Sequence, residues 1–216
     1  MRKFVIITLF PEMFEKVLGS SMMWKAGKDK IVEYKLIDLR EFGLGPRHQV
    51  DDKPYGGGDG MLMMIEPLYG ALEAAKKIAP KAKVLLTTPK GIRWQQQYAK
   101  EYADSGNDYI IICGHYEGMD ERIEQFVDQD VSIGDYVLTG GEIPAMAIID
   151  SIVRLIPGVL GGETSAEIES FSDGSLEFPQ YTRPEEFMGM KVPDILLSGH
   201  HENIKKWRDQ NSKKLS

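Results

Sequence analysis

The stretch SIGDYVLTGGE spans Ser132 to Glu142 and leads into Pro144 to Leu155, whose apolar residues recur at helical spacing. Its central residues predict a short strand near Tyr136 to Leu138. The glycines on both sides are poor choices for the interior of a plain strand. The stretch is therefore an unusual glycine-rich strand that precedes a helix, and by itself it indicates no particular ligand.

Short aliphatic and β-branched runs alternate with segments of helical period along the first two thirds of the chain. This alternation predicts an α/β protein with a largely parallel sheet, and the apolar strands predict burial on both faces. The other predicted strands are Phe4 to Phe10, Glu33 to Leu39, Lys83 to Thr88 and Asp108 to Cys113. The other predicted helices, which would cover the sheet, are Pro67 to Ile78, Ile92 to Tyr102 and Asp120 to Asp128.

A change of composition marks the predicted domain boundary. Residues 158–174 read GVLGGETSAEIESFSDG, which is typical of an exposed, flexible linker. We therefore divide the 216 residues into a main domain of residues 1–160, a linker of residues 161–175 and a short helical C-terminal segment of residues 176–216. That segment includes a predicted helix at Glu202 to Asn211 and is too small to form a core by itself.

The charge balance limits what the chain can bind. The formal net charge is -7, which argues against a protein that coats nucleic acid indiscriminately, because phosphate binding needs many cationic side chains. Any RNA contact must be local. Basic residues gather near the C-terminus, where we interpret them as a solvated helix face rather than a binding surface. They are Lys205, Lys206, Arg208, Lys213 and Lys214.

Cysteine usage and hydropathy predict a cytoplasmic protein. The single cysteine, Cys113, cannot form an intramolecular disulfide. The apolar run at the N-terminus is short and is broken by Pro11, unlike a signal sequence. No run approaches the ~18 apolar residues of a membrane-spanning helix, so no membrane partner is expected.

Several common functional motifs are absent from the sequence. The glycine tract at 56–60 does not fit G-x-G-x-x-G, and neither a P-loop nor the serine-hydrolase motif G-x-S-x-G occurs. One cysteine and four histidines do not make the paired spacing of a structural zinc site. The sequence thus argues against dinucleotide binding, P-loop nucleotide binding and covalent acyl chemistry.

Four long motifs carry a resemblance to a known family. They are DDKPYGGGDGM at Asp51 to Met61, CGHYEGMDER at Cys113 to Arg122, SIGDYVLTGGE at Ser132 to Glu142 and IPGVLG at Ile156 to Gly161. In this order, followed by SFSDG at Ser170 to Gly174 and by PQYTRPEEF, they resemble the bacterial tRNA (guanine-N1)-methyltransferases, the TrmD family of the SPOUT superfamily. The resemblance covers nearly the whole chain.

The resemblance implies a fold and an assembly that periodicity could not show. It implies a SPOUT-type parallel sheet with helices on both faces and a deep C-terminal trefoil knot, although knots are rare among folds. It also implies a homodimer with the active site at the subunit interface. Two features depart from the family: His115 stands where arginine is expected, and the chain ends soon after Trp207, whereas the family usually continues through a longer helical domain. The shorter C-terminal part should affect tRNA binding rather than cofactor binding.

The resemblance further implies that S-adenosylmethionine (SAM) binds in three loops at the knot, 87–89, 114–118 and 133–144. Glycines there would let backbone N–H and C=O groups approach the adenine and ribose, and apolar side chains would wall the adenine. Taken alone, Ile133 and Leu138 are equally well explained as core residues. The implied cofactor-binding residues are Thr87, Thr88, Pro89, Gly114, Tyr116, Gly118, Ile133, Gly134, Asp135, Tyr136, Val137, Leu138, Gly140, Gly141 and Pro144.

The implied reaction moves the methyl group of SAM to N1 of guanosine 37, immediately 3′ of the tRNA anticodon. N1 carries a proton, so a base is needed, and Asp173 matches the family's general base. Arg154 matches the residue that stabilises charge on O6, and Glu117 would recognise the guanine edge. Without the resemblance, Asp173 is an ordinary linker acid and Arg154 a surface arginine at a helix end. The other expected substrate-binding residues are Asp51, Tyr55, Gly60 and Ser170, and a role for Mg²⁺ stays open.

Two alternatives remain open on the sequence. A SPOUT methyltransferase with a different RNA target would keep the cofactor loops but need neither Asp173 nor Glu117. An RNA-binding module without catalysis would fit the short C-terminal segment, although the presence of Arg154 and Asp173 argues against a decayed active site.

Overall fold

The computed structural model describes residues 1–160 and 175–214. The chain divides into two compact units, Met1–Leu160 and Gly161–Ser216. Each unit is described by itself.

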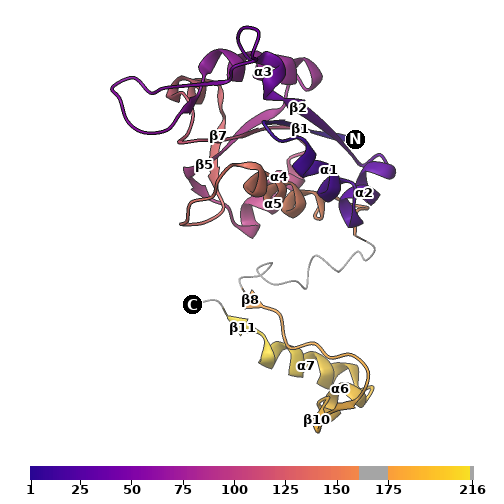
Figure 1. Ribbon diagram of the computed structural model, residues 1–216. Coiled ribbons are helices and arrows are strands. Elements are labelled where there is room, and N and C mark those ends of the chain that lie inside the picture. The colour runs from indigo at the N-terminus through magenta and orange to yellow at the C-terminus, as the bar shows by residue number, and fades with distance from the viewer. Residues whose placement is uncertain (161–174, 215–216) are drawn as a thin grey trace. The chain divides into compact units, whose positions relative to one another are not determined.

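A five-stranded parallel sheet forms the centre of the first unit (Figure 1). The strands lie in the order β2-β1-β6-β5-β7, and every neighbouring pair is parallel. The five strands are β1 Arg2–Thr8, β2 Val32–Asp38, β5 Lys83–Arg93, β6 Tyr109–Cys113 and β7 Gln129–Ser132. The predicted α/β class with a parallel sheet is therefore confirmed, and four of the predicted strands coincide with β1, β2, β5 and β6.

Side chains of β1 face both sides of the sheet in turn, as the two-residue period of a strand requires. Phe4 and Ile6 belong to one buried apolar cluster, whereas Val5 and Ile7 belong to a second. The central strand β6, YIIIC, is buried along its whole length. Such continuous apolar runs are what a parallel sheet covered on both faces requires.

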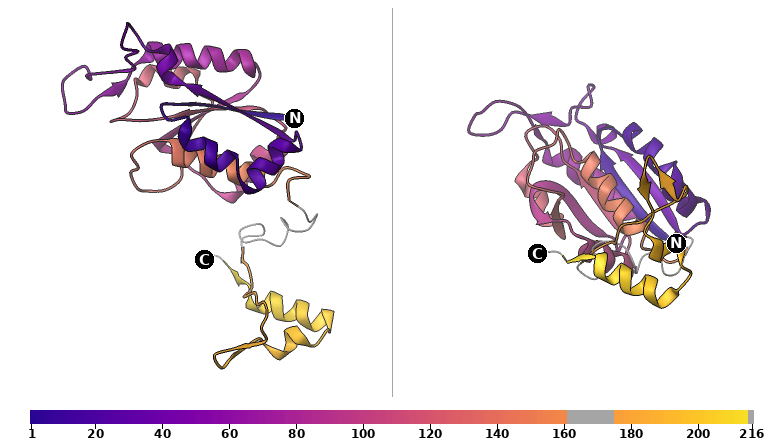
Figure 2. Two further views of the ribbon diagram at one scale, coloured as in Figure 1. Left: turned by 45° about the vertical axis from the view of Figure 1, so that its right-hand side comes forward. Right: turned by 90° about the horizontal axis from the view of Figure 1, so that it is seen from below.

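Helices cover both faces of this sheet (Figures 1 and 2). One face is covered by α3, Ile65–Ile78, and the other by four helices. These are α1 Glu12–Leu18, α2 Ser21–Lys28, α4 Gln96–Asp104 and α5 Glu142–Val153. Two 3-10 helices, η1 Leu39–Phe42 and η2 Glu121–Phe126, and a small antiparallel pair, β3 Asp51–Asp52 with β4 Leu62–Met63, complete the unit. In the part of the chain that the structure describes, no helix is long and apolar enough to cross a membrane.

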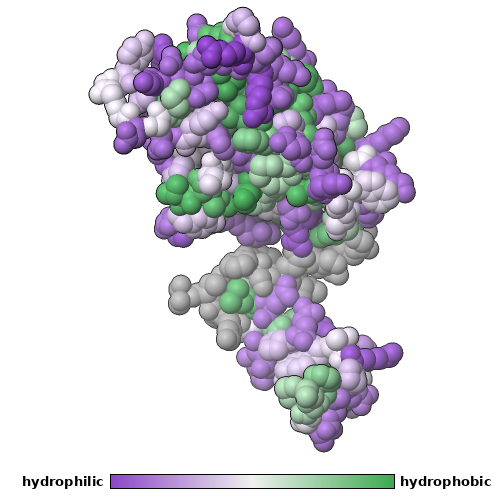
Figure 3. All heavy atoms as spheres, in the orientation of Figure 1, coloured by the Kyte–Doolittle hydropathy of each residue, from purple (hydrophilic) through white to green (hydrophobic). Residues whose placement is uncertain are grey.

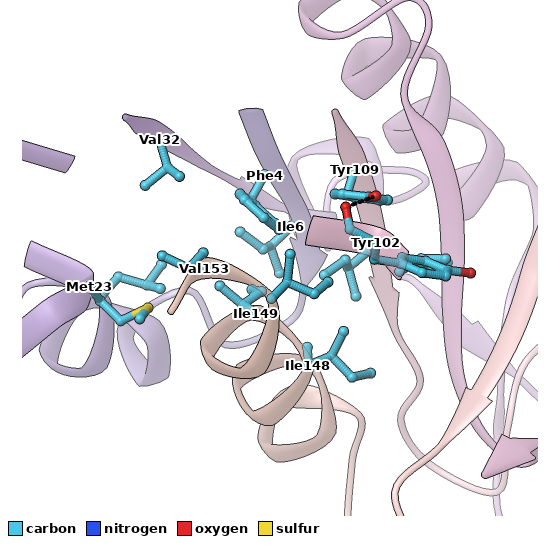
Figure 4. Packing of buried hydrophobic residues seen from close by; sticks show 14 of the residues in the cluster. Phe4, Ile6, Met23, Val32, Tyr102, Tyr109, Ile148, Ile149 and Val153 are labelled. Atoms are coloured by element: carbon cyan, nitrogen blue, oxygen red, sulfur yellow. Dashed lines mark hydrogen bonds between the residues drawn. The ribbon is translucent and has the colours of Figure 1, made fainter. Parts of the chain in front are cut away.

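Helix α5 is the most apolar helix of the first unit and is packed directly on the sheet. Ile148, Ile149 and Val153 are fully buried in the same cluster as Phe4 and Ile6 of β1 (Figure 4). Because α5 follows the glycine-rich stretch, its packing holds that stretch against the ends of the strands.

Replacing Ile149 by alanine should therefore destabilise the first unit. The side chain is 0% exposed, and removing it leaves a cavity in a close-packed core, so we expect a loss of about 3 kcal/mol in the free energy of unfolding. Urea unfolding followed by circular dichroism measures the change. Val17→Ala, at a 41% exposed position of α1, is the control and should cost less than about 1 kcal/mol. Equal losses in the two variants would contradict this packing.

Three predicted elements differ from the observed ones. The predicted strand at Tyr136 to Leu138 is wrong, because this segment is exposed and irregular, and the fifth strand is β7. The predicted helix at Ile92 to Tyr102 begins too early, since Ile92 and Arg93 still pair with β7. The predicted helix at Asp120 to Asp128 is the 3-10 helix η2.

The second unit contains short elements only. Helix α7, His201–Asn211, confirms the predicted helix at Glu202 to Asn211. The others are β8 Ser175–Leu176 paired with β11 Lys213–Lys214, the hairpin of β9 Glu186–Phe187 with β10 Met190–Lys191, and α6 Asp194–Leu197. Neither α6 nor α7 has a fully buried residue, which agrees with the expectation that this segment forms no core of its own.

Candidate active site

A cavity of about 540 Å³ lies at the carboxyl ends of β6 and β7 and at an interruption of β5 after Thr87. In open α/β sheets, ligands bind beyond these strand ends. The volume falls within the range of roughly 300–1,000 Å³ that is usual for small-molecule sites. Three separate segments of the chain form its walls.

The first wall comes from an interruption of β5. Thr87 and Ile92 both pair with Val131 of β7, so the four residues between them leave the ladder. Of these, Thr88, Pro89 and Lys90 line the cavity. The Thr87 hydroxyl, 3% exposed, donates a hydrogen bond to the carbonyl of Ile112 over 3.1 Å and fixes the start of the loop to β6.

The second wall is the loop 114–118 that follows β6. The backbone N–H of Glu117 donates to the carbonyl of Met61 over 3.1 Å, and that of Met63 donates to the carbonyl of Gly118 over 3.0 Å. A Cβ on Gly60 would overlap the Glu117 side chain, so Gly60 lies directly against it. The end of the glycine tract and the residues that follow it thus pack against this loop and support it. The Glu117 side chain lines the cavity.

The third wall is the glycine-rich stretch between β7 and α5. The N–H of Gly141 donates to the carbonyl of Gly114 over 2.7 Å, so this wall touches the second. A Cβ on Gly141 would overlap Thr87 Oγ1 and lie 2.6 Å from the backbone nitrogen of Gly114. Only glycine fits where the three walls meet.

The structure brings nearly all of the predicted cofactor-binding residues together. Every one of them except Asp135 lines the cavity. The Asp135 side chain is 84% exposed and lies 3.5 Å from the Arg93 guanidinium. Three widely separated sequence segments therefore converge on one cavity, which periodicity alone did not predict.

Two of the predicted substrate-binding residues lie outside the cavity lining. Asp51, in β3, lies near Tyr116 of the second wall, and burial together with this carboxylate raises the pKa of Tyr116. Tyr55 is fully exposed and is followed by Gly56, Gly57 and Gly58, all at positive φ. Asp51 thus belongs to the surroundings of the second wall, whereas Tyr55 lies on the exposed segment that precedes Gly60.

Of the two predicted catalytic residues, the structure describes only Arg154. Arg154 directly follows α5 and is half-buried, at the end of the helix opposite the cavity. Asp173, with Ser170, lies outside the described residues.

Sequence reasoning missed three charged residues of the lining. Lys90 Nζ lies 2.9 Å from Glu121 Oε2 and 4.0 Å from Glu124 Oε1, and all three residues line the cavity. The hydrogen bond to Glu121 raises the pKa of Lys90. Lys90 directly follows Pro89, which was predicted to bind the cofactor. This adjacency is the one sequence feature that could have indicated Lys90. Among the described residues, no group of three His, Cys, Asp or Glu side chains could hold a metal ion.

Comparisons with known proteins show the family of this chain. The family model of tRNA (Guanine-1)-methyltransferase TrmD matches residues 1–216. Two similar curated proteins are both named tRNA (guanine-N(1)-)-methyltransferase. The one from Citrifermentans bemidjiense is 53% identical over 95% of this chain and 83% of its own length. The one from Listeria welshimeri is 52% identical over 98% of this chain and 87% of its own length.

A solved structure is also similar to this chain. It is the tRNA (m1G37) methyltransferase from Aquifex aeolicus, which superposes with a TM-score of 0.80 at 41% sequence identity and covers 95% of this chain and 87% of that one. With the full-length family match and these relatives, the chain belongs to the TrmD family of tRNA (guanine-N1)-methyltransferases.

Proposed function

We propose that this chain transfers the methyl group of SAM to N1 of guanosine 37 in tRNA. The observation that carries the proposal is the convergence of loops 87–89, 114–118 and 133–144 on one cavity. The name of the Aquifex aeolicus structure supports the position of the target base. Because its substrate would be tRNA, we also propose that the protein acts in the cytoplasm.

The cavity fits the adenosine part of SAM. Ile133, Leu138 and Pro144 offer apolar walls for a flat base. Gly140 and Gly141 bring backbone groups to the same wall, where donors and acceptors could read the adenine and ribose. When bound, SAM supplies an electrophilic methyl group on a sulfonium.

The chain's own residues would prepare guanine to receive that methyl group. Asp173 accepts the N1 proton, so that the N1 electron pair can form the new bond to carbon while the sulfonium bond breaks and S-adenosylhomocysteine leaves. As N1 is deprotonated, negative charge spreads to O6, and the Arg154 guanidinium stabilises it there. The Glu117 carboxylate accepts hydrogen bonds from the donor groups of the guanine edge.

We further propose that the active form is a homodimer. Arg154 is separated from Glu142 by the whole of α5, so it lies roughly 18 Å along the helix from the cavity of its own chain. A second copy could supply this guanidinium. Exposed apolar side chains beside the cavity support such a contact, since Tyr136 is 54%, Val137 85% and Ile143 50% exposed. Figure 3 shows apolar residues gathered beside the segment that leads into α5.

The knot of the family is part of the same proposal. After β7 the chain returns to the loop that follows β6, as the backbone bridge between His115 and Gly140 indicates. We propose that this return is the threading step of a SPOUT-type trefoil knot. We also propose that the predicted domain 1–160 serves cofactor binding, that the predicted C-terminal segment 176–216 serves tRNA binding, and that residues 161–175 link them.

Tyr55 should contribute to RNA binding through stacking. A fully exposed aromatic ring on a glycine-rich loop is suited to an unpaired base, and such stacking contributes about 1–3 kcal/mol per base. Tyr55→Ala should therefore lower kcat/KM for tRNA by about tenfold while cofactor affinity stays unchanged. Steady-state kinetics with a tRNA transcript measure the first quantity and calorimetry the second. Tyr69→Ala, at a 40% exposed position of α3, is the control, and an equal loss there would contradict the assignment.

The modified nucleoside identifies the reaction. After incubation with SAM and unmodified tRNA, the RNA is digested to nucleosides and analysed by mass spectrometry against 1-methylguanosine. We expect 1-methylguanosine as the product. Another methylated nucleoside would show that the chain methylates a different atom or base.

A further inference from the structure

A buried carboxylate lies behind the cavity, and the proposed reaction does not use it. Glu142, the last residue of the glycine-rich stretch, is 2% exposed. Its Oε1 accepts a hydrogen bond from the buried hydroxyl of Thr8 over 2.8 Å. A carboxylate is rarely buried in an apolar core unless its second oxygen also has a polar neighbour.

The nearest polar group of that kind belongs to His115. A Cβ on Gly140 would overlap Glu142 Oε2 and lie 2.7 Å from His115 Nδ1, so carboxylate and imidazole share the space that the glycine leaves open. His115 Nδ1 is buried and has no hydrogen-bond partner among the described residues. A buried polar atom in a native protein almost always has a partner, and Glu142 Oε2 is the polar atom that lies with Nδ1 beside the Gly140 backbone.

The two side chains sit on different walls of the cavity. His115 is part of the loop 114–118 and lines the cavity, whereas Glu142 begins α5. The backbones already meet at the His115–Gly140 bridge. A side-chain hydrogen bond beside this bridge would fix the distance between the second and third walls of the cavity.

The other groups around the imidazole are few. The Phe10 ring lies 5.0 Å from the His115 ring, and the Tyr116 ring lies 5.0 Å away edge-on. Beyond them, the Arg40 guanidinium lies over Phe10, and Asp51 lies near Tyr116. Cys113 lies near Glu142, but its thiol stays neutral, since burial and that carboxylate raise its pKa. Glu142 is therefore the acid that shares the space beside Gly140 with Nδ1.

We propose that His115 is a positioning residue for the cofactor site, whose imidazole donates a hydrogen bond from Nδ1 to the Glu142 carboxylate and so holds the two walls together. This inference rests on the proposed function, because it takes the cavity to be the cofactor site. Its consequence is that cofactor affinity depends jointly on an N–H donor at position 115 and on the carboxylate at position 142. A hydrogen bond to a carboxylate is stronger than one between two neutral groups.

The test measures binding of S-adenosylhomocysteine to the full-length protein by calorimetry. His115→Phe keeps a ring of similar shape without nitrogen and should bind about tenfold more weakly than the unaltered protein. His115→Arg, which restores N–H donors, should bind as tightly as the unaltered protein. Glu142→Gln should also weaken binding, but it should cause no further loss in His115→Phe, because both substitutions remove the same hydrogen bond. The control His201→Ala, on α7 of the other unit, should bind normally.

Thermal melting of each variant establishes that it is folded. Equal affinity of His115→Phe and the unaltered protein, or losses from His115→Phe and Glu142→Gln that add up in the double variant, would overturn the inference while leaving the proposed function intact. Failure of the unaltered protein to bind S-adenosylhomocysteine would refute the proposed function, and the inference with it.

Discussion

Gly141→Ala should weaken cofactor binding by about 10-fold to 100-fold in affinity. The added Cβ would overlap Thr87 Oγ1 and lie 2.6 Å from the nitrogen of Gly114 and 2.9 Å from Cys113 Cα. Two of these atoms belong to the backbone at the end of β6 and cannot move aside as a flexible side chain can. The third wall must therefore shift, by an overpacking that typically costs about 1–3 kcal/mol. Calorimetry with S-adenosylhomocysteine measures the loss.

Gly27→Ala provides a matched control for this substitution. Gly27 lies in α2, and its Cβ would meet the Tyr34 ring at 3.7 Å, which is an ordinary contact. Alanine is also the better helix former, so stability should be unchanged or slightly higher and cofactor affinity unchanged. If Gly141→Ala bound the cofactor as well as Gly27→Ala does, the meeting point of the three walls would not be part of the site.

Asp173→Ala should remove most methyl transfer without weakening cofactor binding. A general base acts only in the chemical step, and its loss typically lowers the rate by about 100-fold to 10,000-fold. Single-turnover measurements with saturating tRNA report the chemical step, and calorimetry reports the cofactor affinity. A loss confined to the first quantity identifies a residue that acts on the transition state rather than on binding.

Two further variants sharpen this experiment. Asp173→Asn keeps the shape of the side chain but cannot accept the N1 proton, so its rate should be as low as that of Asp173→Ala. The rates of both should rise at alkaline pH, where guanine loses its N1 proton to water without help. Asp104→Ala, which removes an exposed acid of α4, should react at the normal rate. Normal turnover by either Asp173 variant would mean that the proton goes to another group.

Much of the fold follows from local patterns. The run YIIIC in β6 predicts a buried strand because it is apolar at every position, and it is buried throughout. The segment around Val137 is equally apolar, but it lies exposed beside the cavity, so local hydropathy predicted the wrong structure there. Hydropathy cannot distinguish an apolar residue that is buried in a core from an apolar residue that is exposed at a binding surface.

The cavity was predictable only through long motifs. The motifs CGHYEGMDER and SIGDYVLTGGE lie in the second and third walls, and the resemblance that they carry also implied the loop 87–89 of the first wall. The contacts behind the walls were not predictable, because they join residues far apart in the chain. Glu142 meets Thr8 across 134 positions and lies beside His115 only because Gly140 has no side chain. Neither contact has a local sequence signal.

Transfer of label from SAM to two tRNA transcripts tests the central claim most directly. The transcripts differ only at the nucleotide immediately 3′ of the anticodon, which is guanosine in one and adenosine in the other. The protein should label the guanosine transcript and leave the other unlabelled. Equal labelling of both transcripts, or of neither, would contradict the proposed methylation of guanosine 37.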